Sequence, residues 1–93
     1  MGNDMATYQV LYWKKIPAQI RIYKGKRAVS HALPERFQQE IDHVAMQEGI
    51  VGSDAYLNAW QWSEKMEYPG NPEDVALLIL AELEEAYKAS NGK

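Results

Sequence analysis

The residue types that carry out most protein chemistry are scarce in this sequence. It contains no cysteine, which excludes disulfides, thiolate metal sites and cysteine nucleophiles. The two histidines, His31 and His43, lack the HExxH-like spacing that places two metal ligands on one helix face. His43 falls opposite the apolar side of its predicted helix, where it meets solvent. We therefore expect no metal site and no bound cofactor.

Nucleophilic and acid–base sites find no better support. Ser30 precedes His31, but adjacency in sequence does not make a catalytic pair. No GxSxG, P-loop or GxGxxG motif is present. The acids Glu82, Glu84 and Glu85 fit the solvated face of a helix, whereas acid–base catalysis needs a cleft that raises a carboxyl pKa. No catalytic residue is predicted, and the chain is not expected to be an enzyme.

A binding surface has more support than a catalytic site. Polar and apolar residues alternate between positions 17 and 24, so Arg21 and Tyr23 share the face turned away from the core. Trp60 and Trp62 share one face of a later strand. On an open sheet face, these four side chains would form an aromatic and basic platform able to stack nucleic-acid bases. The alternative, which we favour, packs the tryptophan pair beneath the helices.

Two leucines near the C-terminal end form a second candidate surface. Leu77 and Leu78 fall outside the main apolar face of the last predicted helix. Exposed, they would form an apolar patch of the kind that contacts a partner or a second copy. Residues such as Ile50 and Val51 would otherwise cover them, and the sequence supports both interpretations equally.

The elements that position these residues follow from periodicity and capping signals. Two β-rich runs, Tyr8–Lys14 and Pro17–Lys24, predict a hairpin, with a turn at Gly25 after it. Residues 55–68 are ambiguous, because Ser53 and Asp54 would cap a helix whereas the aromatic alternation favours a strand over 57–64. We predict the strand. Helices are predicted over Pro34–Glu48, ending at Gly49, and from the cap Asn71 to about Lys88.

The resulting order, β-β-α-β-α, predicts an α+β domain of two layers. We expect a three-stranded, mainly antiparallel sheet with both helices on one face. The third strand is placed beside the first and antiparallel to it. The 93 residues suffice for a single domain over 1–93, with an ordered core of about 7–89.

The charge is unevenly distributed along the chain. Residues 1–30 hold six basic residues and one acid, whereas residues 31–93 hold four basic residues and twelve acids, for a net charge of −3. This polarity fits either independently solvated halves, which we favour, or an oriented docking surface. No targeting signal or membrane-spanning run is visible, so a cytoplasmic location without membrane contact is expected.

Four segments together resemble the bacterial virulence factor domain family, which also occurs in staphylococcal conserved virulence factor C. They are VLYWKKIPAQI from Val10, LPERFQQEIDHVAM from Leu33, SDAYLNAWQW from Ser53 and NPEDVALLILAELEEAY from Asn71. In larger relatives the domain accompanies HEAT-like repeats, which implies a protein-binding or scaffold role by analogy. The resemblance implies no catalytic residues.

We therefore expect a non-catalytic interaction or scaffold module that contacts a protein partner or a second copy of itself. The candidate binding residues are Arg21, Tyr23, Trp60, Trp62, Leu77 and Leu78. Two alternatives are less favoured. One is single-stranded nucleic-acid binding through the basic and aromatic sheet face. The other is a small-ligand binding protein or enzyme whose pocket the sequence does not reveal.

Overall fold

The sheet is built from two consecutive hairpins at the N-terminal end of the chain. The computed structural model of the protein describes residues 5–91. Strands β1 (Met5–Trp13) and β2 (Ile16–Lys24) form the predicted antiparallel hairpin, in which Val10 lies opposite Ile20. Its turn places Lys14 at a positive φ of 57°. A register shift at Leu11/Tyr12 twists the end of the hairpin that carries Trp13.

The prediction of a three-stranded sheet is wrong, and β3 (Arg27–Ala32) is one reason. This strand pairs with β2 through the two-residue turn Gly25–Lys26, where Gly25 has a φ of 63°. Val29 is its one strongly strand-favouring residue, so its composition gave little sign of a strand. Its position comes from pairing with the strongly patterned β2. The described sheet has five strands, in the order β3-β2-β1-β4, with β5 also paired to β1.

Strands β4 (Trp60–Trp62) and β5 (Met66–Pro69) lie one after the other along the same edge of β1. Both are antiparallel to β1, as predicted for a single third strand. Between β4 and β5 the chain has one extra residue relative to β1. Ser63 maintains the contact with β1 there: its N–H donates to the Val10 carbonyl, and its hydroxyl oxygen accepts from the Val10 N–H. The predicted strand over 57–64 is therefore wrong in its bounds, because the bulge divides the edge into two short strands.

The expected pair of helices becomes three among the described residues. Helix α1 (Glu35–Glu48) ends at Gly49, α2 (Asp54–Asn58) is a short helix, and α3 (Pro72–Asn91) is the last element. Ser53 caps α2, since its Oγ accepts a bond of 3.3 Å from the Tyr56 N–H. The capping residues and the aromatic alternation in this part of the chain each predict an element that is present: the helix α2 comes first and the strand β4 follows it.

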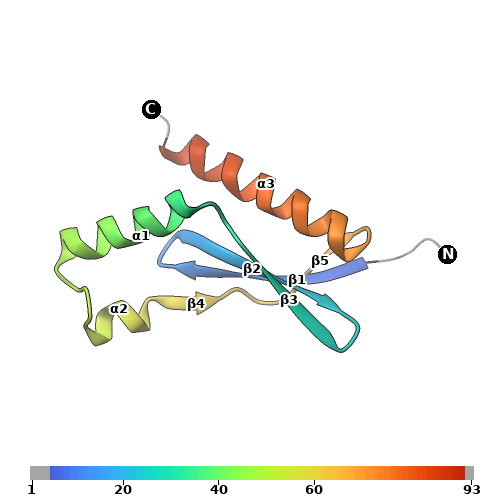
Figure 1. Cartoon of the computed structure of the whole chain (residues 1–93), viewed down its shortest axis with the longest axis horizontal. Coiled ribbons are helices and arrows are strands. Elements are labelled where there is room, and N and C mark those ends of the chain that lie inside the picture. Colours follow the sequence, from blue (N-terminus) through green and yellow to red (C-terminus); the bar gives the residue numbers. More distant parts are fainter. Residues whose placement is uncertain (1–4, 92–93) are drawn as a thin grey trace.

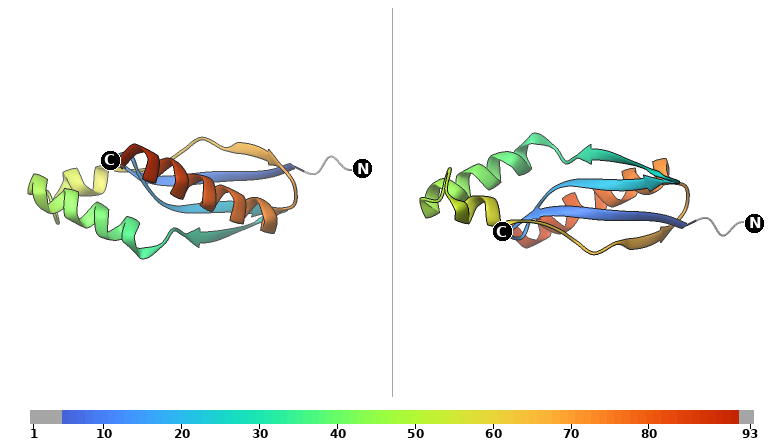
Figure 2. Two further views of the ribbon diagram at one scale, coloured as in Figure 1. Left: turned by 90° about the horizontal axis from the view of Figure 1, so that it is seen from above. Right: turned by 90° about the horizontal axis from the view of Figure 1, so that it is seen from below.

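The helices do not share one face of the sheet in the simple way predicted. Figure 1 shows α3 running across the sheet, whereas α1 and α2 extend beyond the β1–β2 turn. The apolar side of α3 covers β1 and β2, and α1 covers the turn end of the β1–β2 hairpin. Figure 2 looks onto the two faces of the sheet: α3 crosses in front of the strands in the left view and lies behind them in the right view, where no helix covers the strands. That open face bears Arg21 and Tyr23.

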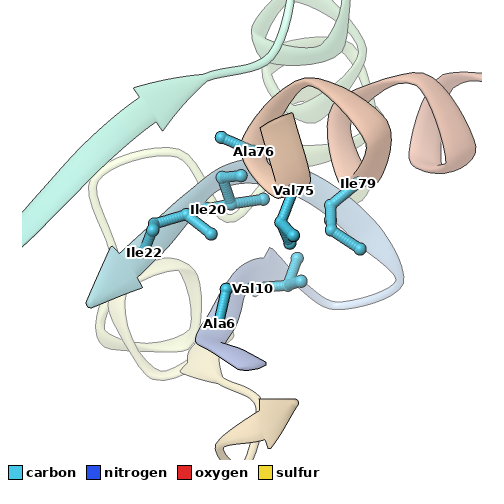
Figure 3. Packing of buried hydrophobic residues seen from close by; sticks show 7 residues of the cluster. All are labelled: Ala6, Val10, Ile20, Ile22, Val75, Ala76 and Ile79. Atoms are coloured by element: carbon cyan, nitrogen blue, oxygen red, sulfur yellow. The ribbon is translucent and has the colours of Figure 1, made fainter. Parts of the chain in front are cut away.

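The first core cluster lies between α3 and the strands (Figure 3). Ala6 and Val10 of β1 and Ile20 and Ile22 of β2 meet the helix. The residues that α3 contributes are Val75, Ala76 and Ile79. All seven are nearly inaccessible to solvent, as the alternation in β2 and the helical spacing in α3 predict.

The second core cluster lies under α1 at the turn end of the sheet. Trp13 and Ile16 flank the hairpin turn and pack with Phe37, Ile41 and Ala45 of α1. The indole N–H of Trp13 donates a bond of 3.0 Å to the Tyr56 carbonyl, so the buried ring leaves no polar atom unpaired. Trp13 thereby fixes α2 and the loop before it to the sheet.

Candidate functional site

An apolar exposed surface lies between α1 and α2. The groove there, called the α1–α2 groove below, has a volume of about 520 Å³. Its lining comprises Asp42, Ala45, Met46, Val51, Gly52, Tyr56 and Leu57. Three large apolar members of this lining are mostly in solvent: Met46 is 70% exposed, Val51 62% and Leu57 63%. A clustering of this kind on a small domain is characteristic of interaction sites.

Capping interactions at the end of α1 and the start of α2 define the shape of the groove. Gly49 ends α1 in the left-handed conformation at a φ of 67°, and its N–H bonds the carbonyls of Ala45 and Met46. Ile50 then turns inward against the second core cluster, while Val51 turns outward. The Ser53 hydroxyl donates a bond of 2.6 Å to the Ile50 carbonyl. The connection between α1 and α2 is therefore defined by capping bonds at both ends.

The charged groups around the groove are acidic. Asp42 lies in its lining, and Asp54 begins α2 next to it. Neither forms an ion pair within the described residues; Asp42 accepts a bond of 3.1 Å from the Gln38 amide on its own helix. Glu48 at the end of α1 is already paired with Lys14 of the hairpin turn. The groove thus combines apolar walls with one carboxylate in its lining, Asp42, and a second, Asp54, beside it, neither of which is paired with a cation among residues 5–91.

The open sheet face brings together three of the predicted binding residues. The Arg21 guanidinium stacks over the Trp62 ring, with its carbon 4.0 Å from the ring centroid. The Tyr23 hydroxyl donates a bond of 2.6 Å to the Gln9 side chain, and the Lys65 ammonium lies 4.8 Å from the Tyr23 ring centroid. Each aromatic ring of this face therefore already carries a cation of the same chain on one side.

Trp60 does not join this face. It lies opposite Trp13 at the turn end of the sheet and packs half-buried against the second core cluster. The Tyr56 ring contacts both indoles, with centroid distances of 5.6 Å to Trp13 and 6.2 Å to Trp60. The register shifts at this end separate the tryptophan pair, so that one member is part of the core and the other belongs to the open face.

Leu77 and Leu78 lie on the side of α3 that faces away from the sheet. They are 68% and 43% exposed, and Val51, one of the residues expected to cover them, is itself in solvent. Neither leucine lines the α1–α2 groove. They form an exposed apolar patch between the acidic first turn of α3 and Glu82.

The remaining titratable groups do not gather into a recognisable chemical site. His43 is exposed on α1, His31 is half-buried on β3, and residues 5–91 contain no group of three side chains suited to a metal ion. Burial and then the nearby Glu82 carboxylate raise the pKa of Tyr8 above its ordinary value. Tyr8 and Glu82 line a shallow groove of about 270 Å³ between β1 and α3.

The sequence alone does not identify Met46, Val51 and Leu57 as binding candidates. The predicted strand includes Leu57, and Val51 enters the sequence analysis only as a residue that would cover the leucines of α3. One usable signal was present. Met46 follows the buried Ala45 on the outer side of α1, and Gly49 and Gly52 bracket two further apolar residues that no helix stripe accounts for.

Comparison with known proteins adds one match. A family model described as "Virulence factor" matches residues 11–91, which is nearly the whole chain. No curated protein and no solved structure matches the chain. No helix within the described residues is both long enough and apolar enough to cross a membrane.

Proposed function

The chain belongs to the virulence factor family, and from that premise we propose that it is a non-catalytic interaction module that binds a protein partner in the α1–α2 groove. The observation that carries this proposal is the gathering of Met46, Val51 and Leu57 around one hollow of about 520 Å³. Burying these three side chains against a partner removes apolar surface from water at about 25 cal/mol per Å². In the folded chain alone these three side chains remain in water, so this free energy is gained only when a partner binds.

The groove has the features of a protein-docking site. Its walls come from two helices whose backbones are tied to the core by Ile50 and by the Trp13–Tyr56 bond, so the partner meets a preformed surface. Met46 is unbranched and adapts its shape to whatever side chain enters. The groove contains a single carboxylate, from Asp42, and lacks the converging polar groups that orient a small ligand.

The charge around the groove indicates the chemistry of the partner. Asp42 and Asp54 are left without a cation by the fold. A segment with one or two large apolar side chains flanked by Lys or Arg satisfies both the groove and these carboxylates. An acidic segment would instead meet repulsion. The partner is therefore an amphipathic, basic peptide segment, of which a short helix is the simplest form.

Nucleic-acid binding on the open sheet face receives less support. Arg21 covers one side of Trp62 and Lys65 covers one side of Tyr23, so base stacking would have to displace contacts already made. An electrophoretic mobility shift assay with a labelled single-stranded oligonucleotide at low salt tests nucleic-acid binding. The proposal expects no binding; a shift that weakens steeply with added salt would favour the nucleic-acid alternative.

Selection from a displayed peptide library tests the proposal without a known partner. The immobilised chain is expected to enrich peptides that combine apolar anchors with Lys or Arg. The enriched peptides should bind at least tenfold more weakly to Leu57→Asp and to Met46→Glu, which place a charge in the groove.

The matched control is Leu77→Asp, because Leu77 is as exposed as Leu57 but lies on α3, outside the groove. It should bind the selected peptides like the unaltered chain. Peptides that lose affinity with Leu77→Asp, and keep it with both groove variants, would place the interaction surface on α3 and end the proposal. Circular dichroism of each variant checks that the fold is retained.

A further inference from the structure

Strand β3 forms an unprotected edge of the sheet. It is the outermost strand on its side, and both views of Figure 2 show no other element beyond it. Its pairing with β2 runs without a break from Arg27 to Ala32. Natural proteins usually blunt such an edge with a proline, a bulge or a central charge, because exposed backbone groups recruit other strands. Between Ala28 and Ala32 this strand has none of these.

The register shows which backbone groups face outward. Lys24 and Arg27 flank a two-residue turn and so form a hydrogen-bonded pair, after which bonded and non-bonded positions alternate. Val29 and His31 therefore bond to β2. The N–H and C=O groups of Ala28, Ser30 and Ala32 point away from the sheet. Within the described residues these groups have no hydrogen-bond partner.

The outward positions are also sterically open. Ala28, Ser30 and Ala32 are all exposed, and their small side chains lie on the helix-free face. A strand approaching this edge meets no bulky or charged group at any of the three positions that it would bond. The edge is therefore able to accept a full strand.

We propose that the occupant is a second copy of this chain, paired antiparallel through β3 about a twofold axis at Ser30. In this register Ser30 lies opposite Ser30 of the other copy, and Ala28 lies opposite Ala32. Each outward N–H then meets a C=O across the interface, as in an ordinary hydrogen-bonded antiparallel ladder. On the helix-covered face Val29 lies opposite His31. The two sheets become one continuous sheet.

Charge complementarity supports a second copy over an unrelated peptide. The same register carries Arg27 to the level of residue 33 of the other copy, where α1 is about to begin. Glu35 lies in the first turn of that helix, and neither Arg27 nor Glu35 is used in an ion pair within the described residues. The basic β2–β3 turn of each copy thus approaches the acidic helix start of the other, and no like charges face each other along β3.

This inference is independent of the α1–α2 groove, which lies on other elements. The test uses the full chain in sedimentation velocity over a wide range of concentrations. A concentration-dependent dimer is expected. Ser30→Pro removes only an outward N–H, which edge strands tolerate, and should weaken the dimer at least tenfold while circular dichroism stays unchanged. Ser30→Ala retains that N–H and should dimerise like the unaltered chain.

Because the chain lacks cysteine, oxidative cross-linking gives a second readout. Facing positions in an antiparallel ladder fall within disulfide reach, so Ser30→Cys should form a covalent dimer on mild oxidation. Glu67→Cys, exposed on β5 at the other edge, should remain monomeric. A chain that stays monomeric at every concentration would overturn the proposal, as would a dimer unaffected by Ser30→Pro. Binding of an extended peptide to monomeric chain would likewise overturn it.

Discussion

Arg21 stacks on Trp62 across the helix-free face of the sheet, with the guanidinium carbon 4.0 Å from the centroid of the indole ring. The pair joins β2 to β4 over the intervening β1. Two residues that looked like parts of a ligand platform are therefore partners of each other. This contact stabilises the short edge strand β4, which has only three residues of its own pairing with β1.

Replacing Arg21 should measure that contribution. Arg21→Gln keeps a polar side chain on the strand but removes the cation, and we expect a loss of about 0.5–1 kcal/mol in the free energy of unfolding. Urea denaturation followed by circular dichroism provides the measurement. Lys26→Gln, at the exposed β2–β3 turn, is the control for removing one positive charge. Equal losses in both variants would mean that the stacking contributes nothing specific.

Trp13 and Trp62 should respond very differently to truncation. Trp13 is fully buried and its indole N–H donates to the Tyr56 carbonyl, so Trp13→Phe leaves a void and removes one of the two hydrogen bonds that this carbonyl accepts, the other coming from the Ala59 N–H. A lost buried hydrogen bond costs about 0.5–1.5 kcal/mol, and the void adds to that loss. Trp62→Phe, on the open face, should cost less than Trp13→Phe. Chemical denaturation of the two variants compares them, and a Trp62→Phe loss equal to or above that of Trp13→Phe would contradict the assignment of Trp13 to the core.

Stability should fall in alkaline solution because of Tyr8. Burial, aided by Glu82, raises its pKa above the ordinary 10.0, so the folded chain resists deprotonation more than the unfolded chain. This contribution is present below about pH 10 and is lost as the pH rises through the folded pKa. Tyr8→Phe and Glu82→Gln should both reduce the fall in unfolding free energy between about pH 9 and 11. Unaltered slopes in both variants would refute this cause.

The ion pair between Lys24 and Glu73 ties the end of β2 to the start of α3, with 2.6 Å between Nζ and Oε2. The hydrogen bond from Lys24, and then its charge, lower the pKa of the Glu73 carboxyl below its ordinary 4.5. A carbon-detected NMR titration of Lys24→Gln should show that pKa returning upward. Lys26→Gln, two residues away, should leave it in place. A Glu73 pKa that does not move with Lys24→Gln would show that the pair does not persist in solution.

Strong local signals could be interpreted correctly from the sequence. Asn71 and Pro72 marked the start of α3 because capping and a proline at the first helical position are local effects, and Asp74 N–H indeed donates to the Asn71 side chain at 2.9 Å. Gly49 marked the end of α1 for a similar reason. The alternation of Ile20 and Ile22 with Arg21 and Tyr23 correctly separated the two sheet faces.

The errors arose where pairing outweighed local preference. Strand β3 is held by its ladder to β2, which no single-residue propensity reveals. The bulge after Trp62 depends on Ser63 bonding Val10, a contact across 53 positions of sequence. The α1–α2 groove could not be predicted because α2 was interpreted as a strand. Without α2, Leu57 had no reason to approach Met46.

The proposed partner site is tested most directly by an NMR titration of the isotope-labelled chain with the strongest peptide from the library selection. Amide signals of Met46, Val51 and Leu57 should shift progressively and saturate, while those of Arg21 on the open face and Leu77 on α3 stay in place. Saturable shifts centred on Leu77 and Leu78 or on the open sheet face, with the α1–α2 groove unaffected, would contradict the assignment of partner binding to this groove.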